Sequence, residues 1–440
     1  MKDIWKDFAR YVSLNILGQA AYACYTVADT FLVAAKVGAN GLAALNLAFP
    51  MFCFVSGTGL MIGIGGGTGY AIARGRGEDE EANRAFTNAA ILAMAFSLLY
   101  VLTGLLGSAP LARLLGADDE LLGLTNTYLR TLLLFAPAFL ANHLLQCFVR
   151  NDGKPSLSMA ALIAGSVSNI ALAYVFIFRF GWGIFGSILA AGLAPVIGIV
   201  VMLPHLLRGK CRFRLVRTRP SAKGLGAILA TGVSPFLTEA TSGVVMFVFN
   251  YIILRLSGNI GVAAFSVISV LSLAVVALYT GLSQGIQPIL SRSYGMGNRA
   301  DVETTLRCAV VTAALLSAAL YAVLFFGAEP IAASFNSEGN PTLQAYAVAG
   351  IRRYFLACPF IGLNIVLATY FISTERPKPA QAISLLRGLL VLVPMAFLLS
   401  GLWGLTGVWY AYPATEIMVA LAGVVLFQLL KSGKRDILAR

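Results

Sequence analysis

Charged side chains are scarce in this sequence, where aspartate, glutamate, lysine and arginine together make up 12% of the 440 residues. Soluble domains carry roughly 25% charged residues. Hydrophobic residues instead account for 58% of the chain. This composition excludes an ordinary soluble domain and predicts an all-α integral membrane protein.

Histidine and cysteine are scarce as well, with two and six copies. The spacing of the cysteines is not typical of a disulfide framework or a metal site, so we expect them to be packing residues. The sequence also contains no Ser/His/Asp set, catalytic carboxylate pair or metal-ligand cluster of recognised spacing. We therefore expect neither an enzyme nor a bound metal or other cofactor.

A glycine-rich stretch lacks the features of a nucleotide site. Gly59, Gly63 and Gly67 recur every four residues, but no strand precedes them and neither a G-x-G-x-x-G register nor a Walker lysine is present. Small residues at this spacing allow two membrane helices to approach closely. We expect the stretch to serve helix packing or a hinge.

Long apolar windows are plentiful, and windows of about 20 residues or more predict transmembrane helices. Twelve are found, near residues 11–35, 42–73, 85–108, 122–149, 156–178, 184–207, 225–255, 262–292, 304–327, 342–373, 380–400 and 405–430. The first is too long for the apolar core of a secretory signal, which spans about 7–15 residues. We expect it to be a retained membrane helix.

The sequence is also internally duplicated. Thr58-Gly-Leu matches Thr280-Gly-Leu at an offset of 222 residues, and Trp182-Gly matches Trp403-Gly at 221. Six windows fall in each half, and an even number makes the two repeats parallel, as in transporters built from repeats. We predict two pseudo-symmetric lobes, residues 1–207 and 225–440, joined by a basic linker at residues 208–224.

The distribution of lysine and arginine predicts the orientation. With the N-terminus inside, 24 of the 32 basic residues fall in cytoplasmic segments and 7 on the opposite side, while Arg387 lies within a helix. The positive-inside rule then places both termini in the cytoplasm. We expect the protein in the inner or plasma membrane. The net charge of +13 requires no nucleic acid, because anionic lipid headgroups attract such basic loops.

Four ionisable residues lie within predicted membrane helices, namely Asp29, Glu239, Arg387 and Glu416. Each costs a few kcal/mol at the bilayer centre unless it faces a cavity or a partner. Arg387 either pairs with Glu239 or Glu416 in a structural ion pair, or lines a substrate cavity with them. Asp29 has no evident basic partner, so desolvation disfavours its ionised form unless a cation or hydrogen bonds compensate.

Comparison of the two repeats separates scaffold positions from unmatched polar ones. Gln19 aligns with Glu239, and Asp29 aligns with Phe249. We expect the two lobes to divide the handling of ion and substrate.

Three further polar residues lie in predicted helices. Gln284 and Gln287 are expected to line the cavity, and Gln287 has the alternative of satisfying backbone exposed by Pro288. His143 either relays protons or forms a hydrogen bond with a neighbour.

Four patterns occur in order along the chain: Val27-Ala-Asp-Thr leading to Gly38-Ala-Asn-Gly-Leu-Ala-Ala, Phe148-Val-Arg-Asn-Asp-Gly-Lys-Pro, Gln284-Gly-Ile-Gln-Pro running to Tyr294-Gly, and Gly404-Leu-Thr-Gly-Val-Trp. With these patterns the whole chain resembles the multidrug and toxic compound extrusion (MATE) family. The Arg-Asn-Asp-Gly-Lys-Pro stretch is most similar to the bacterial multidrug-efflux branch.

The resemblance implies two six-helix bundles forming a V around a central cavity. It also implies export of cationic, amphiphilic compounds in exchange for inward H+ or Na+. The family's first-helix aspartate falls on Asp29 and its helix-five asparagine on Asn169. Ala173 stands where many relatives have an aspartate, so the ion site of the first lobe has lost a ligand. Some relatives carry a carboxylate in helix ten, but no acidic residue occurs between Tyr354 and Thr374. A sodium site in the second lobe is therefore not expected, which leaves Glu239 for the substrate.

We thus predict a monomeric secondary antiporter working by alternating access among membrane lipids. Ion coupling is assigned to Asp29, Asn169 and Gln19. The substrate cavity is assigned to Glu239, Gln284, Gln287, Arg387, Glu416 and His143. One alternative is a lipid-linked oligosaccharide flippase, which would need several cations in the cavity, and another is a membrane-embedded enzyme.

Overall fold

The computed structural model describes residues 2–209, 211–218, 221–336 and 339–438. Within these ranges every regular element is a helix and no strand occurs. The helices are α1 (Lys2–Val37), α2 (Ala39–Arg76), α3 (Asp79–Leu106), α4 (Ser108–Leu114), α5 (Leu122–Leu134), α6 (Ala136–Asn151), α7 (Pro155–Tyr174), η1 (Val175–Arg179), α8 (Gly183–Leu207), α9 (Ala222–Gly295), α10 (Arg299–Phe326), α11 (Ala328–Phe335), α12 (Pro341–Tyr354), η2 (Phe355–Ala357), α13 (Cys358–Ser373), α14 (Pro377–Leu385), η3 (Leu386–Leu390) and α15 (Leu392–Leu438). The all-α prediction is confirmed.

The described residues contain twelve membrane-crossing segments. Nine helices or continuous helical runs are long and apolar enough to cross a membrane, and the bent pair α5–α6 adds a tenth crossing. Two of these runs are broken at glycines with positive φ, α9 at Gly258 (60°) and α15 at Gly404 (57°). Glycine populates this region without steric cost, so each break divides its run into two crossings.

The duplication appears in the backbone as well as in the sequence. Three glycine pairs related by offsets of 220 or 221 residues all have positive φ. They are Gly38 and Gly258, Gly77 and Gly297, and Gly183 and Gly404. A fourth pair differs, because Gly153 (φ 87°) is replaced in the second half by Glu375 (φ 57°). The turns that end the helices are thus repeated along with the helices.

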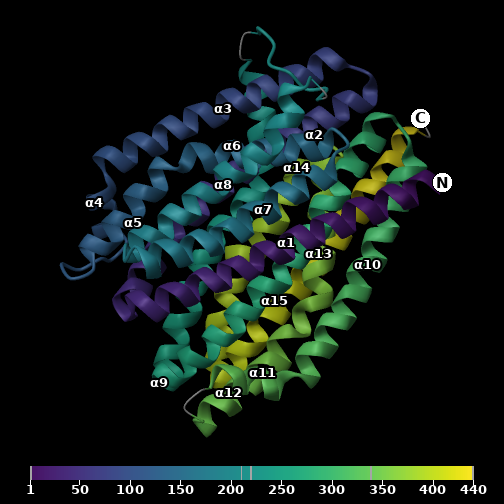
Figure 1. Ribbon diagram of the computed structural model, residues 1–440. Coiled ribbons are helices and arrows are strands. Elements are labelled where there is room, and N and C mark those ends of the chain that lie inside the picture. The colour runs from purple at the N-terminus through teal and green to yellow at the C-terminus, as the bar shows by residue number, and fades with distance from the viewer. Residues whose placement is uncertain (1, 210, 219–220, 337–338, 439–440) are drawn as a thin grey trace.

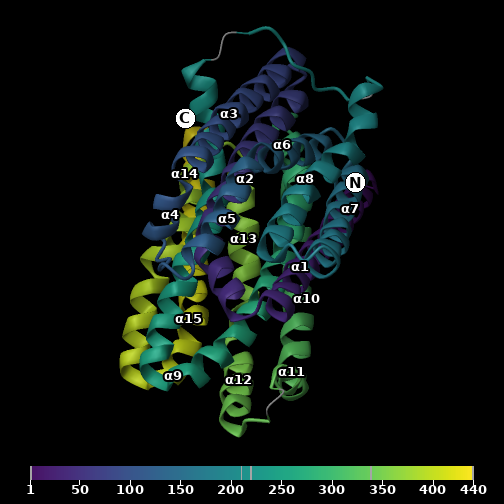
Figure 2. The ribbon, with the colours of Figure 1, turned by 60° about the vertical axis from the view of Figure 1, so that its left-hand side comes forward.

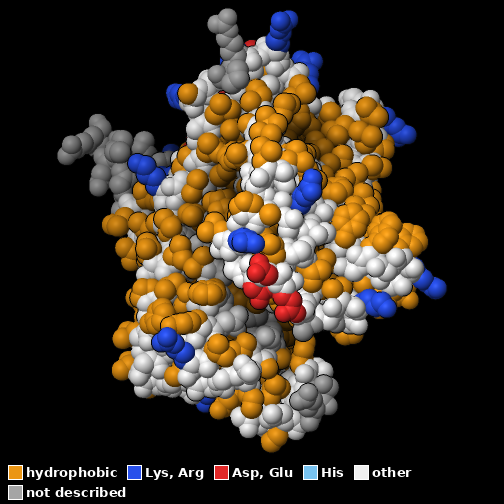
Figure 3. Space-filling view, turned by 90° about the vertical axis from the view of Figure 1, so that its left-hand side faces the viewer, with side chains coloured by type: hydrophobic (Ala, Val, Ile, Leu, Met, Phe, Trp, Pro, Cys, Tyr) orange, Lys and Arg blue, Asp and Glu red, His pale blue; other side chains and the backbone are white. Residues whose placement is uncertain are grey.

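Each half has its own hydrophobic core. One cluster of buried side chains is drawn mainly from α2 to α8 and includes Leu132 and Phe148, whereas a second comes from α9 to α15 and includes Phe355 and Trp409. Figure 1 shows the purple-to-teal half beside the green-to-yellow half, with α1 crossing between them. On the face in Figure 3 hydrophobic side chains predominate, as expected of a surface in contact with lipid.

The two halves approach most closely near the chain ends. Gly65 of α2 packs on the backbone of Ile228, and Gly281 packs on that of Ile16 in α1, leaving no room for a Cβ atom. By contrast, a Cβ atom at Gly243 of α9, further toward the opposite end, would meet Pro50 of α2 at 3.6 Å, an ordinary van der Waals distance. In Figure 2 both chain ends and the connection from α8 to α9 lie in the upper part of the molecule. The lobes therefore converge at the end that carries the termini.

Two predicted continuous windows are interrupted next to prolines. The window 122–149 is split between α5 and α6, which are bent by 46°, and the window 342–373 is interrupted by the short 3₁₀ turn η2. Pro137 and Pro359 lie at the starts of the following helices, where a proline is tolerated but breaks the preceding hydrogen-bond ladder.

The predicted linker, residues 208–224, is held against the first lobe. Three of its residues lie outside the described ranges, namely Lys210, Arg219 and Pro220. Phe213 is 2% exposed and packs against Phe86 with ring centroids 4.7 Å apart. The helix α9 already begins at Ala222, so the linker ends before residue 224. The contact of Phe213 with Phe86 anchors the linker to the first lobe.

Candidate functional site

Asp29 lies in α1 and is 9% exposed. The hydroxyl of Ser187 in α8 donates to both carboxylate oxygens, at 3.0 Å to Oδ1 and 3.2 Å to Oδ2. Among the described residues no lysine or arginine forms an ion pair with Asp29. The carboxylate is therefore buried with one hydroxyl donor and no opposite charge.

Asn169 lies in α7 and is fully buried. Neither its amide oxygen nor its nitrogen has a hydrogen-bond partner within the described part of the chain. Asn169 is one turn from Ala173, which packs with Val33 and Ala190. Asp29 and Ser187 are within one turn of Val33 and Ala190, so all three polar residues border one apolar cluster. A buried amide without partners costs about 1–3 kcal/mol, which marks this region as a candidate ion site.

Sequence reasoning missed Ser187, although the duplication contained the signal. At the offset of 221 residues Ser187 corresponds to Val408, and Asn169 corresponds to Leu390. Both are polar residues in one repeat with apolar counterparts in the other, as Asp29 is with Phe249. The same comparison therefore identifies all three members of the candidate ion site.

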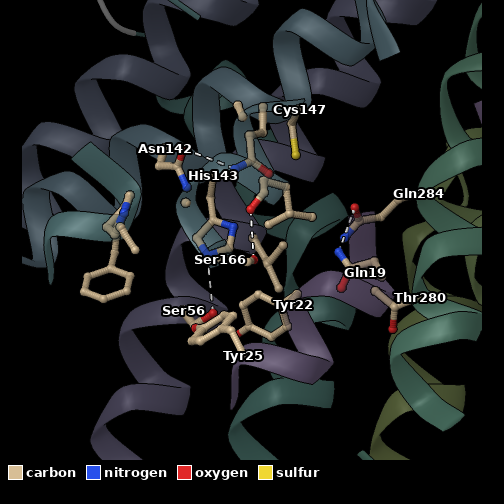
Figure 4. A pocket seen from close by; sticks show the side chains of 18 of the residues that line it. Gln19, Tyr22, Tyr25, Ser56, Asn142, His143, Cys147, Ser166, Thr280 and Gln284 are labelled. Atoms are coloured by element: carbon tan, nitrogen blue, oxygen red, sulfur yellow. Dashed lines mark hydrogen bonds between the residues drawn. The ribbon is translucent and has the colours of Figure 1, made fainter. Parts of the chain in front are cut away.

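Gln19 contacts a different partner. Its amide nitrogen donates to Oε1 of Gln284 in α9 at 3.3 Å, and Figure 4 shows these two side chains pointing toward each other. The structure therefore groups Gln19 with the predicted cavity residue Gln284, and it records no contact between Gln19 and Asp29 in the described residues.

His143 faces a cavity of about 90 Å³ between α1, α2, α6, α7, α8 and α9. A hydrogen bond of 3.3 Å joins its Nε2 to Oγ of Ser56 (Figure 4). The glycine stretch of α2 packs here, because Gly59 and Gly63 lie directly against His143. The structure thus bears out the packing interpretation of these glycines, and it supplies the hydrogen-bonded neighbour considered for His143.

Arg387 pairs with Glu416. Its Nε and Nη2 donate to Oε1 of Glu416 at 3.0 and 2.9 Å, and Asn364 donates to Oε2 at 2.7 Å. Glu416 is fully buried and the Arg387 side chain is 12% exposed. Of the two partners left open by the sequence, the structure selects Glu416. We interpret the pair as structural, although both residues line a second cavity of about 210 Å³.

Glu239 has no hydrogen bond or ion pair among the described residues. It lies in the first crossing of α9, with its Cβ facing Gly57 of α2. Glu239 lines both the His143 cavity and a neighbouring cavity, also of about 90 Å³, between the lobes. It is thus a carboxylate available to a ligand.

Gln287 links the two lobes. Its amide nitrogen donates to Thr68 at 3.0 Å, and its Oε1 accepts from Asn151 at 3.1 Å. Gln287 is 3% exposed and lines the cavity between the lobes. These contacts favour the cavity-wall interpretation over a bond to backbone exposed by Pro288.

Arg150 was counted from the sequence as a cytoplasmic basic residue, but it is 2% exposed. One of its guanidinium nitrogens donates to Gln284 at 2.9 Å. It lines the same two cavities as Glu239. Arginine at the end of an apolar window does not by itself indicate burial, so the sequence provided no signal for this position.

No group of three or more His, Cys, Asp or Glu side chains is placed to hold a metal ion in the part of the chain that the structure covers. The candidate ion site consists of the Asp29 carboxylate, the Ser187 hydroxyl and the Asn169 amide, all in the first lobe. A second carboxylate, that of Glu239, lies between the lobes.

Comparison with curated proteins identifies relatives over nearly the full length. Multidrug export protein MepA of Staphylococcus saprophyticus subsp. saprophyticus is 24% identical over 435 residues, covering 97% of this chain and 94% of that protein. Multidrug export protein MepA of Staphylococcus aureus strain MRSA252 is 23% identical over 430 residues, with coverage of 97% and 94%.

Solved structures share the fold. The outward-facing conformation of a multidrug resistance MATE family transporter of the MOP superfamily aligns with a TM-score of 0.92 at 22% identity, covering 98% of this chain and 96% of that chain. A MOP superfamily transporter from Pyrococcus furiosus, described as having reverse polarity of its binding pocket, aligns at 0.90 and 22% identity, covering 97% and 96%. The predicted fold of twelve helices in two bundles is confirmed.

Family membership follows from the sequence itself. The model of the MatE family matches residues 15–175 and 236–398, which together make up well over half of the chain. The two matched segments fall one in each repeat. This multi-pass membrane protein therefore belongs to the MatE family.

Proposed function

We propose that the protein is a secondary active exporter of cationic, amphiphilic compounds. The observation that carries this proposal is Glu239, a carboxylate without a partner in the described structure, on the wall of two cavities that reach the boundary between the lobes. An organic cation is the ligand that would compensate such a charge in a membrane. The names of the MepA relatives support multidrug export.

Asp29 supplies the coupling site in this proposal. A proton neutralises the carboxylate directly, whereas Na+ would also use the oxygens of Ser187 and of the unpartnered Asn169 amide. Either cation favours burial of Asp29, and its release leaves an uncompensated charge. Ion binding would thus bias the protein between conformations, as antiport in exchange for H+ or Na+ requires.

The arrangement of the lobes fits one state of an alternating-access cycle. The lobes converge at the end that carries the termini. If both termini are cytoplasmic, as the distribution of basic residues predicts, the cavity is closed toward the cytoplasm and faces outward. The proposal places the protein in the inner or plasma membrane as a monomer, acting without a cofactor and without enzymatic chemistry.

The flippase alternative is less well supported. It needs several cations facing the cavity, but Arg387 is neutralised by Glu416. Arg150 is then left as the one lining arginine without a carboxylate partner among the described residues of these cavities.

Efflux from proteoliposomes tests the proposal. A fluorescent organic cation is loaded, and its efflux is measured under an imposed proton gradient and, separately, an imposed sodium gradient. We expect one gradient to drive efflux by the wild type. Efflux that neither gradient accelerates would contradict coupled export.

A further inference from the structure

A separate pocket lies at the end of the molecule that carries the termini. Its volume is about 530 Å³, and none of its described lining residues lines the cavities considered above. The second lobe supplies most of its walls, from the turn between α9 and α10, the first turns of α10, the end of α13 and residues 427–431 of α15. Arg76, at the end of α2, comes from the first lobe.

Positive charge predominates in this pocket. Its lining contains four cations, Arg76, Arg299, Arg376 and Lys431, and the carboxylate of Glu303. Lys431 pairs with Glu303 at 3.2 Å, and Arg76 pairs with Glu375 at 2.7 Å. Arg299 and Arg376 form no ion pair with an aspartate or glutamate of the described chain. Two uncompensated guanidinium groups are therefore available to an anion in this basic pocket.

The start of α10 adds to the positive potential. This helix of 28 residues begins at Arg299, and Asn298 and Arg299 both line the basic pocket. The N-terminal end of a helix favours negative charge. Asp301 lies in the same turn, but it does not line the pocket, and its carboxylate accepts from Nδ2 of Asn298 at 2.7 Å. Nearby carboxylates are thus paired, while the two arginines are not.

One side of the basic pocket is apolar. Val302 and Leu306 of α10 and Phe427 and Leu430 of α15 line it beside the cations. Further from the end that carries the termini, α10 and α15 present large hydrophobic side chains on their exposed surfaces, namely Val311, Leu315, Leu421 and Val425. In a membrane protein such surfaces face acyl chains. The pocket therefore joins a cationic end to a lipid-facing surface.

We propose that the basic pocket binds the phosphate group of an anionic phospholipid, with Arg299 and Arg376 as its cationic ligands. The guanidinium fork matches phosphate oxygens, and basic pockets between membrane helices bind anionic headgroups. A free phosphate needs only the cations, whereas the apolar side fits the acyl chains of a lipid. Because Arg76 lines the same pocket, the bound lipid contacts both lobes where they converge.

Lipid titration of the full-length protein in detergent tests the proposal. Dioleoylphosphatidylglycerol and dioleoylphosphatidylcholine have the same acyl chains, but only the first has a net negative charge. Binding of each is measured by native mass spectrometry. We expect the wild type to bind phosphatidylglycerol about tenfold more tightly than phosphatidylcholine. The variant Arg299→Gln/Arg376→Gln should bind the two lipids with affinities within about twofold of each other.

Two variants control for charge alone. Arg84→Gln/Arg208→Gln removes two arginines of the first lobe that do not line the basic pocket, and it should keep the preference for phosphatidylglycerol. Glu303→Gln releases Lys431 from its ion pair, so it should strengthen phosphatidylglycerol binding by up to about fivefold.

Other outcomes would overturn the inference. Equal loss of preference in both double variants would mean that net charge, and not this pocket, attracts the lipid. Inorganic phosphate that displaces phosphatidylglycerol and raises the melting temperature of the wild type as much as the lipid does would assign the pocket to a free anion. If Arg299→Gln/Arg376→Gln does not fold, a wild type without preference for phosphatidylglycerol decides against the proposal.

This inference goes beyond the proposed function, and the two fail separately. Lipid binding is measured in detergent without any ion gradient or exported compound. A preference for phosphatidylglycerol in a protein that shows no coupled efflux would leave the lipid site standing, and coupled efflux without the preference would overturn the lipid site alone.

Discussion

The two lobes hold related cavities with different chemistry. At the repeat offsets, Asn142 corresponds to Asn364, Ser166 to Arg387 and Pro195 to Glu416. The first member of each pair lines the cavity around His143. In the second lobe these positions form the buried Arg387–Glu416 pair and its asparagine donor. Equivalent positions of the two repeats therefore carry neutral side chains in the first lobe and an ion pair with its asparagine donor in the second.

The difference suggests a division of work. The first lobe keeps Asp29 without a cationic partner, so the ionisation of this lobe can change when an ion binds. In the second lobe both charges of the Arg387–Glu416 pair are already satisfied, and changing either one is costly. We infer that ion coupling belongs to the first lobe and that the ion pair maintains the shape of the second.

The largest expected effect comes from removing the unpaired carboxylate of the first lobe, Asp29. Asp29→Asn should abolish gradient-driven export, because the amide is not ionised and cannot respond to a proton or Na+. The protein should remain folded, as measured by its elution and melting in detergent. Asp119→Asn, at an exposed aspartate paired with Arg113, is the matched control and should export normally. Full coupled export by Asp29→Asn would refute the assignment.

Breaking the ion pair should affect stability. Glu416→Gln leaves Arg387 buried without its counter-charge, which costs about 3–5 kcal/mol and should lower the melting temperature in detergent. The double variant Arg387→Met/Glu416→Leu removes both charges and should recover most of that loss. If the single and double variants were equally unstable, the pair would not be the cause.

A smaller effect is expected from the hydroxyl beside Asp29. Ser187→Ala removes a hydrogen bond to a carboxylate, worth roughly 1.5–3 kcal/mol when the acceptor is charged. The dependence of export on proton or sodium concentration should then shift by about tenfold or more, with the maximal rate less affected. Ser266→Ala, which removes an exposed hydroxyl bonded to the Val262 carbonyl, should leave that dependence unchanged.

The smallest effect is expected where the lobes meet at the surface. Arg76 of the first lobe pairs with Glu375 of the second at 2.7 Å, and their side chains are 41% and 46% exposed. Exposed pairs of this kind contribute about 0.2–1 kcal/mol. Arg76→Gln should therefore change the export rate by less than about fivefold. The matched control is Arg84→Gln, which removes a half-exposed arginine of α3 that pairs with Glu80. A complete loss of export would mean that the closed end depends on this pair.

The sequence was most informative where it could be compared with itself. Aligning the repeats gave the two lobes and singled out Asp29 through Phe249, and the same comparison would have found Ser187 through Val408. The helix breaks at Pro137 and Pro359 were less visible, because a proline in an apolar window does not say how far the helix bends.

Burial of polar groups could not be derived from composition. Arg150 directly follows an apolar window, a position that is also typical of an exposed cytoplasmic arginine. Only the packing of α6 against its neighbours shows that Arg150 is 2% exposed. The choice of Glu416 over Glu239 as the partner of Arg387 likewise depends on how the helices pack. The sequence identifies an intramembrane charge such as Arg387, but only the tertiary structure shows which residue is its partner.

Gradient-driven efflux by three proteins tests the division between the lobes most directly. Wild type, Asp29→Asn and Arg387→Met/Glu416→Leu are placed in proteoliposomes at equal density, and efflux of one organic cation is followed under imposed proton and sodium gradients. The account predicts that the double variant responds to the same gradient as wild type and that Asp29→Asn responds to neither. A response by Asp29→Asn together with its loss in the double variant would place ion coupling in the second lobe and contradict the account.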